Sequence, residues 1–492
     1  MMLIRSICKT MNMSYVSGSL RMYSTETPIS FSALENRILK SGDPRTSMAP
    51  ILNQWIEQGR QVTQPVLKRI INRLANYGRF THALQVSEWM SNINSNDLSP
   101  GDIAKRLNLI SKVHGLEQAE IFFKGIPETK LGFKIYASLL GCYAEHKSLE
   151  EAEVIMKKIK KLNPVHMTVC YNMMLKLYAQ TGKYEKMDRL MQGMKENDIC
   201  NGATFNIRLN AYSSSRDIEG MEKLLMQMEA DPLATIDWYT YATAANGYMK
   251  AGNVEKASAS LKKSENLVND LSRRVAYESL QSIHAAIGNK DEVYRLWNRC
   301  KNLKKSSNSS YLCMLSSLVK LDDIDGAEKI LQEWESGHTY FDMRIPNLMI
   351  TAYCKWGLLD KAESYIKRLL DNGKELDGSS WDRMSSAYHA DNDMEKAVQT
   401  MKKITSGSRQ RRGWKPNTYT LCACIKYLKE KVDVEQALEI LKLFKEDGHI
   451  SATTYDRLVS YVHSEVEDTE AFDMIKQDYQ MNENVQLHDA EK

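Results

Sequence analysis

The feature that most constrains this chain is a unit of about 35 residues that recurs along most of its length. Its clearest copy, residues 168–201, reads TVCYNMMLKLYAQTGKYEKMDRLMQGMKENDICN. Tyr171 and Tyr178 stand seven residues apart and therefore share one face of a helix, with apolar residues beside them. Gly182 interrupts this pattern, and a second apolar stripe begins at Met187. The unit predicts two short amphipathic helices joined by a tight turn, neither of which can bury its apolar face alone.

Copies of the unit align on the first buried position of the second helix, called the slot position from here on. Its occupants are Ala83, Ala119, Ala152, Met187, Met221, Ala257, Val293, Ala327, Ala362, Ala397, Ala437 and Ala471. Nine of these twelve residues are alanine, which suits a close approach of two helices. In most copies an aromatic residue stands sixteen positions before the slot, and glycine often stands five before it. We therefore expect an all-α fold, a right-handed α-solenoid superhelix of tandem helix-turn-helix repeats.

The bulk properties agree with this expectation. A length of 492 residues ordinarily indicates two or three globular domains, but a solenoid grows by stacking. No run of about 18 apolar residues is present, so we expect no membrane span. The formal net charge of +4 neither favours nor excludes a nucleic-acid partner. The nine cysteines are scattered and form no Cys-x-x-Cys pair, which predicts reduced core residues.

The first 23 residues contain Arg, Lys and hydroxyl residues but no acidic residue, as transit peptides do. Arg21-Met22-Tyr23-Ser24 is similar to a mitochondrial processing site, and the moderate serine content favours the mitochondrial matrix over the chloroplast. The alternative is an unprocessed tail. Residues 24–62 are expected to form N-terminal capping helices, residues 63–480 about eleven or twelve tandem repeats, and residues 481–492 a polar tail.

The repeated units resemble pentatricopeptide repeats. Val169-Cys170-Tyr171-Asn172 matches the start of that family's unit, and Tyr178-Ala179-Gln180-Thr181-Gly182-Lys183 matches its central turn. Leu358-Leu359-Asp360-Lys361-Ala362-Glu363 matches the start of its second helix. The resemblance covers about five-sixths of the chain, and its presequence and composition are similar to those of plant organellar members of the P type. Several units depart from the pattern. Pro346 replaces the aromatic residue in one of them. In another, Tyr419 precedes Ala437 by eighteen residues rather than sixteen, which leaves the alignment of that unit open.

The resemblance implies single-stranded RNA as the ligand, with about one base read by each unit. In this family the base edge is contacted by the residue after the aromatic and by the last residue of the same unit. Carried over, the pairs are Asn172 with Asn201, Asn206 with Asp237, and Asn347 with Asp377. The family's pattern implies a pyrimidine for the first pair and uridine for the other two. The alternative reading is that these residues only cap helices or lie at the surface.

Other units lack the usual pairings, among them Ala137 with Met167, Ala242 with Arg273, Glu278 with Ser307 and Leu312 with Asp342. Basic residues that could meet RNA phosphates are Lys157, Lys158, Lys161, Arg273, Arg274, Arg411 and Arg412. Each of these groups is also consistent with a solvated helix end, or with a solvated loop for the last two.

We expect no enzymatic activity, no cofactor and no metal. His463-Ser464-Glu465 begins like a zinc deaminase motif, but no Cys-x-x-Cys follows to supply the remaining metal ligands. The expected function is that of an organellar RNA-binding protein in mitochondrial RNA metabolism: stabilisation, processing, splicing or translation. The alternative, favoured by the units without usual pairs, is a mitochondrial protein-interaction scaffold, for example on the mitochondrial ribosome.

Overall fold

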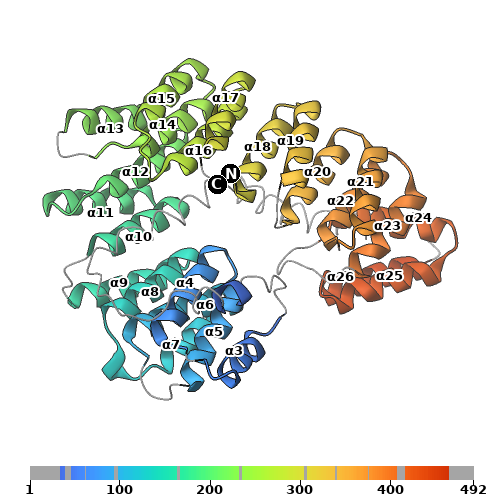
Figure 1. Ribbon diagram of the computed structural model, residues 1–492, viewed down its shortest axis with the longest axis horizontal. Coiled ribbons are helices and arrows are strands. Elements are labelled where there is room, and N and C mark those ends of the chain that lie inside the picture. Colours follow the sequence, from blue (N-terminus) through green and yellow to red (C-terminus); the bar gives the residue numbers. More distant parts are fainter. Residues whose placement is uncertain are drawn as a thin grey trace. The chain divides into compact units, whose positions relative to one another are not determined.

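The computed structural model describes residues 34–38, 46–60, 62–93, 98–162, 167–231, 235–303, 307–337, 341–374, 376–406 and 416–464. Regular structure in these ranges is helical, and no strand occurs within them. The helices follow one another as short antiparallel pairs (Figure 1), so the predicted all-α fold of tandem helix-turn-helix repeats is confirmed. The presequence 1–23 and the polar tail 481–492 lie outside the described residues, and the predicted domain boundaries stay predictions.

The helices fall into two compact units, with the division between Asn253 and Val254. In the N-terminal unit, α3 precedes the regular pairs and a short 3-10 helix separates α7 from α8. Its helices are α3 (Met48–Glu57), α4 (Gln64–Asn76), α5 (Phe80–Ile93), α6 (Pro100–His114), α7 (Leu116–Lys124), η1 (Glu128–Lys130), α8 (Phe133–Glu145), α9 (Leu149–Lys161), α10 (Met167–Gln180), α11 (Tyr184–Glu196), α12 (Gly202–Ser215), α13 (Ile218–Ala230) and α14 (Trp238–Lys250).

The C-terminal unit repeats the same arrangement. Its helices are α15 (Val254–Asn266), α16 (Arg273–Ala286), α17 (Lys290–Lys301), α18 (Asn308–Lys320), α19 (Ile324–Gly337), α20 (Arg344–Lys355), α21 (Leu359–Asp371), α22 (Gly378–Ala390), α23 (Met394–Ser406), α24 (Thr418–Glu430), α25 (Val434–Glu446) and α26 (Ala452–His463). Within each unit the first helix of a pair packs against its own second helix, and from α6 to α14 and from α16 to α26 it also packs against the first helix of the next pair. In these ranges the first helices therefore form a continuous row.

The slot positions are where this packing is tightest. All eleven slot residues in the described ranges, from Ala83 to Ala437, have 0% of their surface exposed, and each lies one turn into its second helix. Ala471 lies outside the described residues. The sequence pattern therefore located a fully buried residue in every described second helix.

The turn between the two helices of a pair requires a left-handed backbone residue. Gly182 and Gly357 both have φ of 69°, a conformation that costs glycine little. Non-glycine residues occupy the equivalent turn elsewhere, including Asn392 with φ of 62° and Val432 with φ of 59°. The turn is thus retained where glycine is absent, and valine there must accept backbone strain because of its branched side chain.

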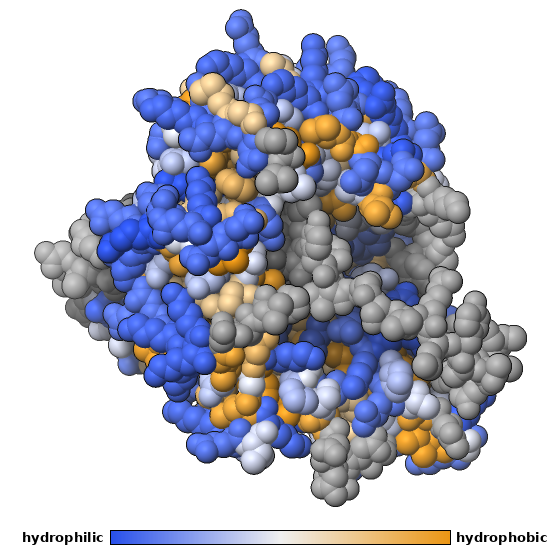
Figure 2. Space-filling model, turned by 90° about the vertical axis from the view of Figure 1, so that its left-hand side faces the viewer, coloured by the Kyte–Doolittle hydropathy of each residue, from blue (hydrophilic) through white to orange (hydrophobic). Residues whose placement is uncertain are grey.

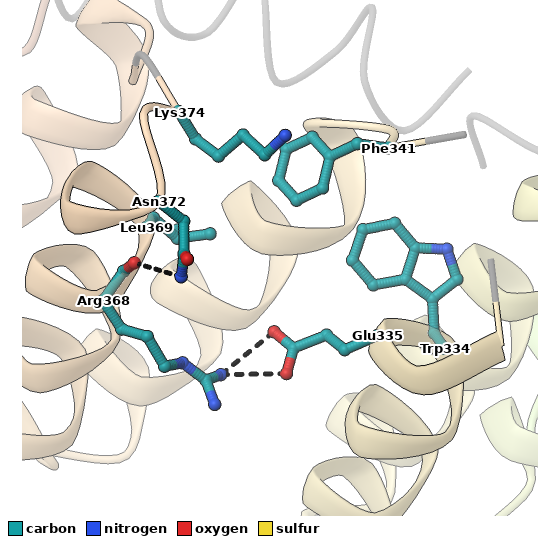
Figure 3. A pocket seen from close by; sticks show the side chains of 7 residues that line it. All are labelled: Trp334, Glu335, Phe341, Arg368, Leu369, Asn372 and Lys374. Atoms are coloured by element: carbon teal, nitrogen blue, oxygen red, sulfur yellow. Dashed lines mark hydrogen bonds and ion pairs between the residues drawn. The ribbon is translucent and has the colours of Figure 1, made fainter. Parts of the chain in front are cut away.

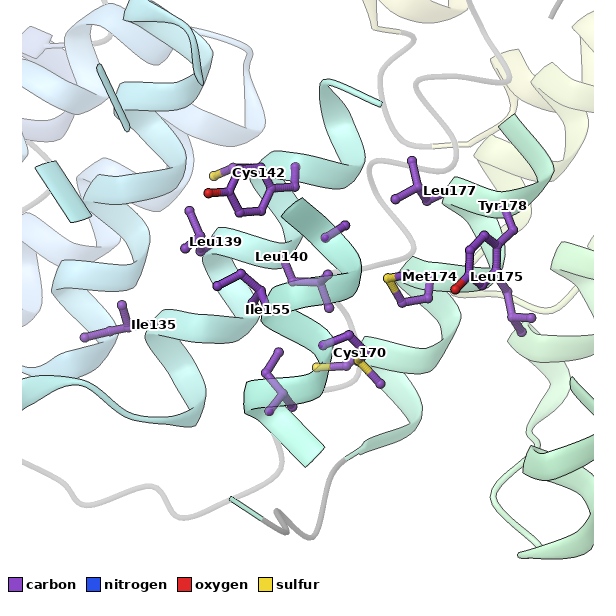
Figure 4. Packing of buried hydrophobic residues seen from close by; sticks show 14 of the residues in the cluster. Ile135, Leu139, Leu140, Cys142, Ile155, Cys170, Met174, Leu175, Leu177 and Tyr178 are labelled. Carbon is purple, nitrogen blue, oxygen red and sulfur yellow. The ribbon is translucent and has the colours of Figure 1, made fainter. Parts of the chain in front are cut away.

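The core of each unit is apolar and runs from pair to pair. Figure 4 shows part of it in the N-terminal unit, where Leu139 and Leu140 of α8, Ile155 of α9 and Met174 of α10 belong to one buried cluster. Cys142 and Cys170 lie in the same cluster, and burial raises the pKa of each thiol to about 11. These thiols act as small apolar core residues, as the sequence predicted.

A recurring polar contact ties neighbouring pairs together at the edge of this core. The Tyr178 hydroxyl on α10 donates to Glu153 Oε1 on α9 at 3.1 Å, and Lys186 Nζ on α11 lies 2.7 Å from the same oxygen. Lys186 holds the pKa of Glu153 below its usual value. In the C-terminal unit Tyr388, Glu363 and Lys396 make the same arrangement. The second tyrosine of the unit therefore both packs and donates a hydrogen bond to the preceding pair.

The structure decides the alignment of one unit. Asn417 is the N-cap residue of α24 and its side chain accepts from the Thr420 backbone N–H, so Leu421 occupies the position that an aromatic residue takes in other units. Leu421 stands sixteen residues before Ala437, which restores the regular spacing. Tyr419 lies in the first turn with 58% of its surface exposed. The sequence left this alignment open because the nearest aromatic residue, Tyr419, does not stand at the regular spacing.

On the face of the molecule drawn in Figure 2, the described residues are mostly hydrophilic, with apolar residues in small groups between them. Among the described residues, no helix has the length and apolar character needed to cross a membrane.

Candidate nucleic-acid interface

Three of the predicted base-reading residues lie in the first two turns of first helices. Asn172 is on α10, Asn206 on α12 and Asn347 on α20, each directly after the position at which the helix packs into the core. The last residue of each unit lies immediately before the next first helix. This arrangement brings a residue of one first helix beside the N-terminus of the following one.

The first pair is assembled by direct hydrogen bonds. Asn172 Nδ2 donates to Asn201 Oδ1 at 3.3 Å, and Thr204 Oγ1 lies 2.9 Å from Asn172 Oδ1. The Thr204 backbone N–H also donates to Asn201 Oδ1 at 3.0 Å, which makes Asn201 the N-cap residue of α12. Asn172 is half-buried and Asn201 is exposed, so the cluster reaches the surface.

The pair on α20 and α22 has the same geometry with a carboxylate in place of one amide. Asn347 Nδ2 donates to Asp377 Oδ2 at 2.8 Å, and the Ser380 hydroxyl donates to Asn347 Oδ1 at 2.7 Å. Asp377 Oδ1 accepts the Ser380 backbone N–H at 3.1 Å and caps α22. One of these hydrogen-bonded pairs lies in the N-terminal compact unit and the other in the C-terminal one, and both use equivalent positions of the repeat.

The third predicted pair is not assembled. Asp237 Oδ1 accepts the backbone N–H of Thr240 at 3.0 Å and caps α14. Asn206 is buried, and its Oδ1 has no hydrogen-bond partner among the described residues. A buried amide oxygen without a partner is costly. Asn206 and Asp237 are therefore correctly placed by the repeat but do not bind each other.

The two readings of these residues are compatible in the structure. Asn201, Asp237 and Asp377 are N-cap residues, as the structural alternative proposed. Asn172 and Asn347 are inside their helices and cap nothing. Capping uses one side-chain oxygen on each cap residue, so hydrogen-bonding groups remain for a ligand.

Two acidic residues at the equivalent helix position are buried. Asp382 follows Trp381 on α22 and accepts the Asn417 backbone N–H at 2.9 Å. Burial raises the pKa of Asp382 to about 6. Glu278 on α16 accepts the Ser310 hydroxyl at 2.6 Å, and burial raises its pKa as well.

The pair Asp382 with Asn417 was missed by the sequence reasoning, because Tyr419 had displaced the alignment of that unit. Counting sixteen residues back from Ala437, rather than looking for an aromatic residue, would have found it.

The basic candidates divide by location. Lys157, Lys158 and Lys161 are exposed on the last turns of α9, which is a second helix, where their charge also favours the helix C-terminus. Arg273 and Arg274 lie at the start of α16, a first helix, and Arg273 is ion-paired with Asp270. The two remaining candidates, Arg411 and Arg412, lie outside the described residues.

A cavity of about 360 Å³ lies between the ends of α19 and α21. Figure 3 shows Arg368 bound to Glu335 and Lys374 placed over the Phe341 ring, with its Nζ 4.6 Å from the ring centre. Both cations are thus already engaged, and none of the lining residues is a predicted base-reading residue. Within the described ranges no cluster of three or more His, Cys, Asp or Glu side chains could hold a metal ion.

Comparison with known proteins gives a consistent result. The family model described as PPR repeat matches residues 134–163, 169–199, 203–232, 309–337 and 345–373. A pentatricopeptide repeat-containing protein of Arabidopsis thaliana, named as mitochondrial, is 44% identical over 437 residues, which are 88% of each chain. A second Arabidopsis protein of the same description is 31% identical over 428 residues, or 87% of each chain. The crystal structure of the maize pentatricopeptide repeat protein PPR10 matches with 16% identity and a TM-score of 0.45, covering 97% of this chain and 71% of that one.

Proposed function

Because the chain belongs to the pentatricopeptide repeat family, we propose that it binds single-stranded RNA and reads bases through the side-chain pairs on its first helices. The observation that carries the proposal is the direct hydrogen bonding of Asn172 to Asn201 and of Asn347 to Asp377. These residues are far apart in sequence, and the family's base-reading pattern pairs them.

The chemistry of these pairs suits a base edge. Asn172 and Asn347 each have two N–H donors and an oxygen with two lone pairs, of which the internal contacts use one donor and one lone pair. A donor and an acceptor therefore remain side by side, as a pyrimidine edge requires. We assign a pyrimidine to the Asn172 pair, and uridine to the Asn206 and Asn347 pairs.

Basic side chains supply the sequence-independent part of the affinity. Lys157, Lys158, Lys161, Arg273 and Arg274 are proposed phosphate contacts, together with Arg411 and Arg412. Replacing a phosphate contact should weaken binding by a similar factor for every RNA and reduce the salt dependence. Replacing a base-reading residue should change the base preference and leave the salt dependence unaltered.

We place the protein in the mitochondrial matrix, where it acts in RNA metabolism by occupying a transcript segment, without catalytic activity of its own. Two lines of support are the basic, acid-free presequence and the mitochondrial names of its relatives. Occupation of a transcript could stabilise it, or direct its processing, splicing or translation.

The test is a change of base preference. RNA is selected from a random pool by the parent protein, and four versions of the selected RNA, differing at one position, are titrated at constant salt. Asn206→Thr should move the preference at one position from uridine towards guanine, as the family's pattern implies, and Asn347→Thr should do so at another. A well-placed base contact discriminates by about 1–3 kcal/mol, so a change of about tenfold is measurable.

Asn298→Thr is the matched control, since Asn298 is exposed on the second helix α17. It should leave all preferences unchanged. If the parent selects no RNA, or if neither variant alters any preference, the base-reading proposal is wrong. Protein contacts, for example with the mitochondrial ribosome, would then be the function to examine.

A further inference from the structure

A buried hydroxyl residue recurs three positions after the cap residue of the first helices. It is found at Thr204, Thr240, Ser310, Ser380 and Thr420, and each is at most 2% exposed. Burying a hydroxyl is unfavourable unless it is hydrogen-bonded. Capping accounts for part of its bonding, but four of the five hydroxyls also reach back to the preceding first helix. Thr204 meets Asn172, Ser310 meets Glu278, Ser380 meets Asn347, and Thr420 meets Ser386.

Counting the donors and acceptors around Thr204 shows which atom accepts its hydroxyl proton. Asn201 Oδ1 already accepts the Thr204 backbone N–H and the Asn172 side-chain N–H. The Thr204 oxygen in turn accepts the Asn201 backbone N–H at 3.1 Å. A hydroxyl has a single proton, and the acceptor that is not otherwise used is Asn172 Oδ1, 2.9 Å away.

The Ser380 hydroxyl is in the same situation. Asp377 Oδ1 accepts the Ser380 backbone N–H and the Ser379 hydroxyl. The distance from Ser380 Oγ to Asn347 Oδ1 is 2.7 Å, shorter than its 3.0 Å to Asp377 Oδ1. The proton of Ser380 therefore goes to Asn347. In both clusters the asparagine amide nitrogen donates to the last residue of its own repeat, and its oxygen accepts from a hydroxyl of the next repeat.

We propose that Thr204 and Ser380 are positioning residues for base recognition, each fixing the base-reading asparagine of the preceding unit. This inference rests on the proposed function. An amide fixed at both ends presents its free donor and acceptor in one orientation, which sharpens discrimination between bases. The base preference of one unit then depends on a residue of the next, which contacts no base.

The chain provides a matched control. Thr240 has the same place in α14, and its hydroxyl and backbone N–H both bind Asp237 Oδ1. Asn206 occupies the repeat position of Asn172, but its Oδ1 has no hydrogen-bond partner within the described residues. The Thr240 hydroxyl therefore does not fix the Asn206 amide. Removing this hydroxyl disturbs a cap and one contact to Asp237, but it releases no asparagine amide and does not touch the Asn172 cluster.

The experiment measures base discrimination and thermal stability together. The position read by Asn172 is identified as the one at which Asn172→Ala removes the preference of the parent for one base. At that position Thr204→Val should lower the ratio of best to worst affinity by about threefold to tenfold, the worth of one hydrogen bond. Thr240→Val should lower Tm by a similar amount to Thr204→Val but leave the base ratio at the position read by Asn172 unchanged.

Thr204→Ser keeps the hydroxyl and should keep the affinity ratio of the parent. Ser380→Ala should lower the ratio at the RNA position read by Asn347, as Thr204→Val does at the position read by Asn172. If the parent discriminates at the Asn172 position and Thr204→Val keeps the full ratio, the positioning role is refuted and the proposed function stands. If the parent discriminates at no position, the proposed function and this inference are both refuted. Equal loss of discrimination in Thr204→Val and Thr240→Val would show a general effect of stability and would also overturn the inference.

Discussion

Neutralising the buried carboxyl of Asp382 should stabilise the protein in a pH-dependent way. Asp382 is 8% exposed, and its side-chain contact is the Asn417 backbone N–H on Oδ1. Asp382→Asn keeps an oxygen for this N–H but has no charge at any pH. The variant therefore separates the cost of burying the charge from the value of the hydrogen bond.

The magnitude follows from the pKa. Burial raises the pKa of Asp382 from its ordinary 3.8 to about 6, so ionisation opposes folding. The favourable contribution of the protonated carboxyl is complete below pH 3.8 and is lost as the pH rises through about 6. The shift of about two pKa units corresponds to about 3 kcal/mol at pH 8, and linkage reduces this to about 0.5 kcal/mol at pH 4. For a block of about 150–250 residues, 3 kcal/mol is a change in Tm of roughly 6–12 °C.

The assay is thermal unfolding followed by circular dichroism at pH 8 and at pH 4. Asp382→Asn should have a higher Tm than the parent at pH 8, and nearly the same Tm at pH 4. Asp371→Asn, in which an exposed carboxylate at the end of α21 is changed, should not show this dependence on pH. A Tm difference of the same size at both pH values, or a lower Tm of Asp382→Asn at pH 8, would refute the assignment of a destabilising buried charge.

Three further predictions concern packing, the turn and processing. Ala362→Trp should lower the free energy of unfolding by about 3 kcal/mol or more, because Ala362 is fully buried. Urea melts superimposable on those of the parent would contradict this. Lys367→Trp, at an exposed position, is the control. Val432→Gly should raise the stability by about 1 kcal/mol, because Val432 has φ of 59° and is 83% exposed; a lower Tm would show that the turn is not strained. The mature chain should begin near Ser24, and N-terminal sequencing of the protein from isolated mitochondria that recovers Met1 would disprove it.

Three kinds of detail were decided only by the tertiary structure. The first is the start of α24 at Thr418, which places Leu421 rather than Tyr419 in the core; Asn417 selected this start by capping, and no count of aromatic residues could reveal it. The second is the burial of Asp382, which depends on how closely α22 and α24 approach. The third is the state of the base-reading residues: Asn172 and Asn347 are hydrogen-bonded on both sides, while Asn206 is not.

The sequence alone determined the architecture, because its signals act over short distances. A small residue at the slot, an aromatic sixteen residues before it and a turn residue five before it each constrain one helix pair, and repetition removes chance matches. Complete burial at the slot from Ala83 to Ala437 follows from that pattern. The resemblance to the pentatricopeptide repeat family identified which residues of one repeat to pair, such as Asn172 and Asn201. Whether two such side chains form a hydrogen bond depends on shifts of a few tenths of an ångström between packed helices, since hydrogen bonds weaken steeply with distance and angle. Those shifts are set by the packing of all the side chains between the helices, and only the folded structure contains them.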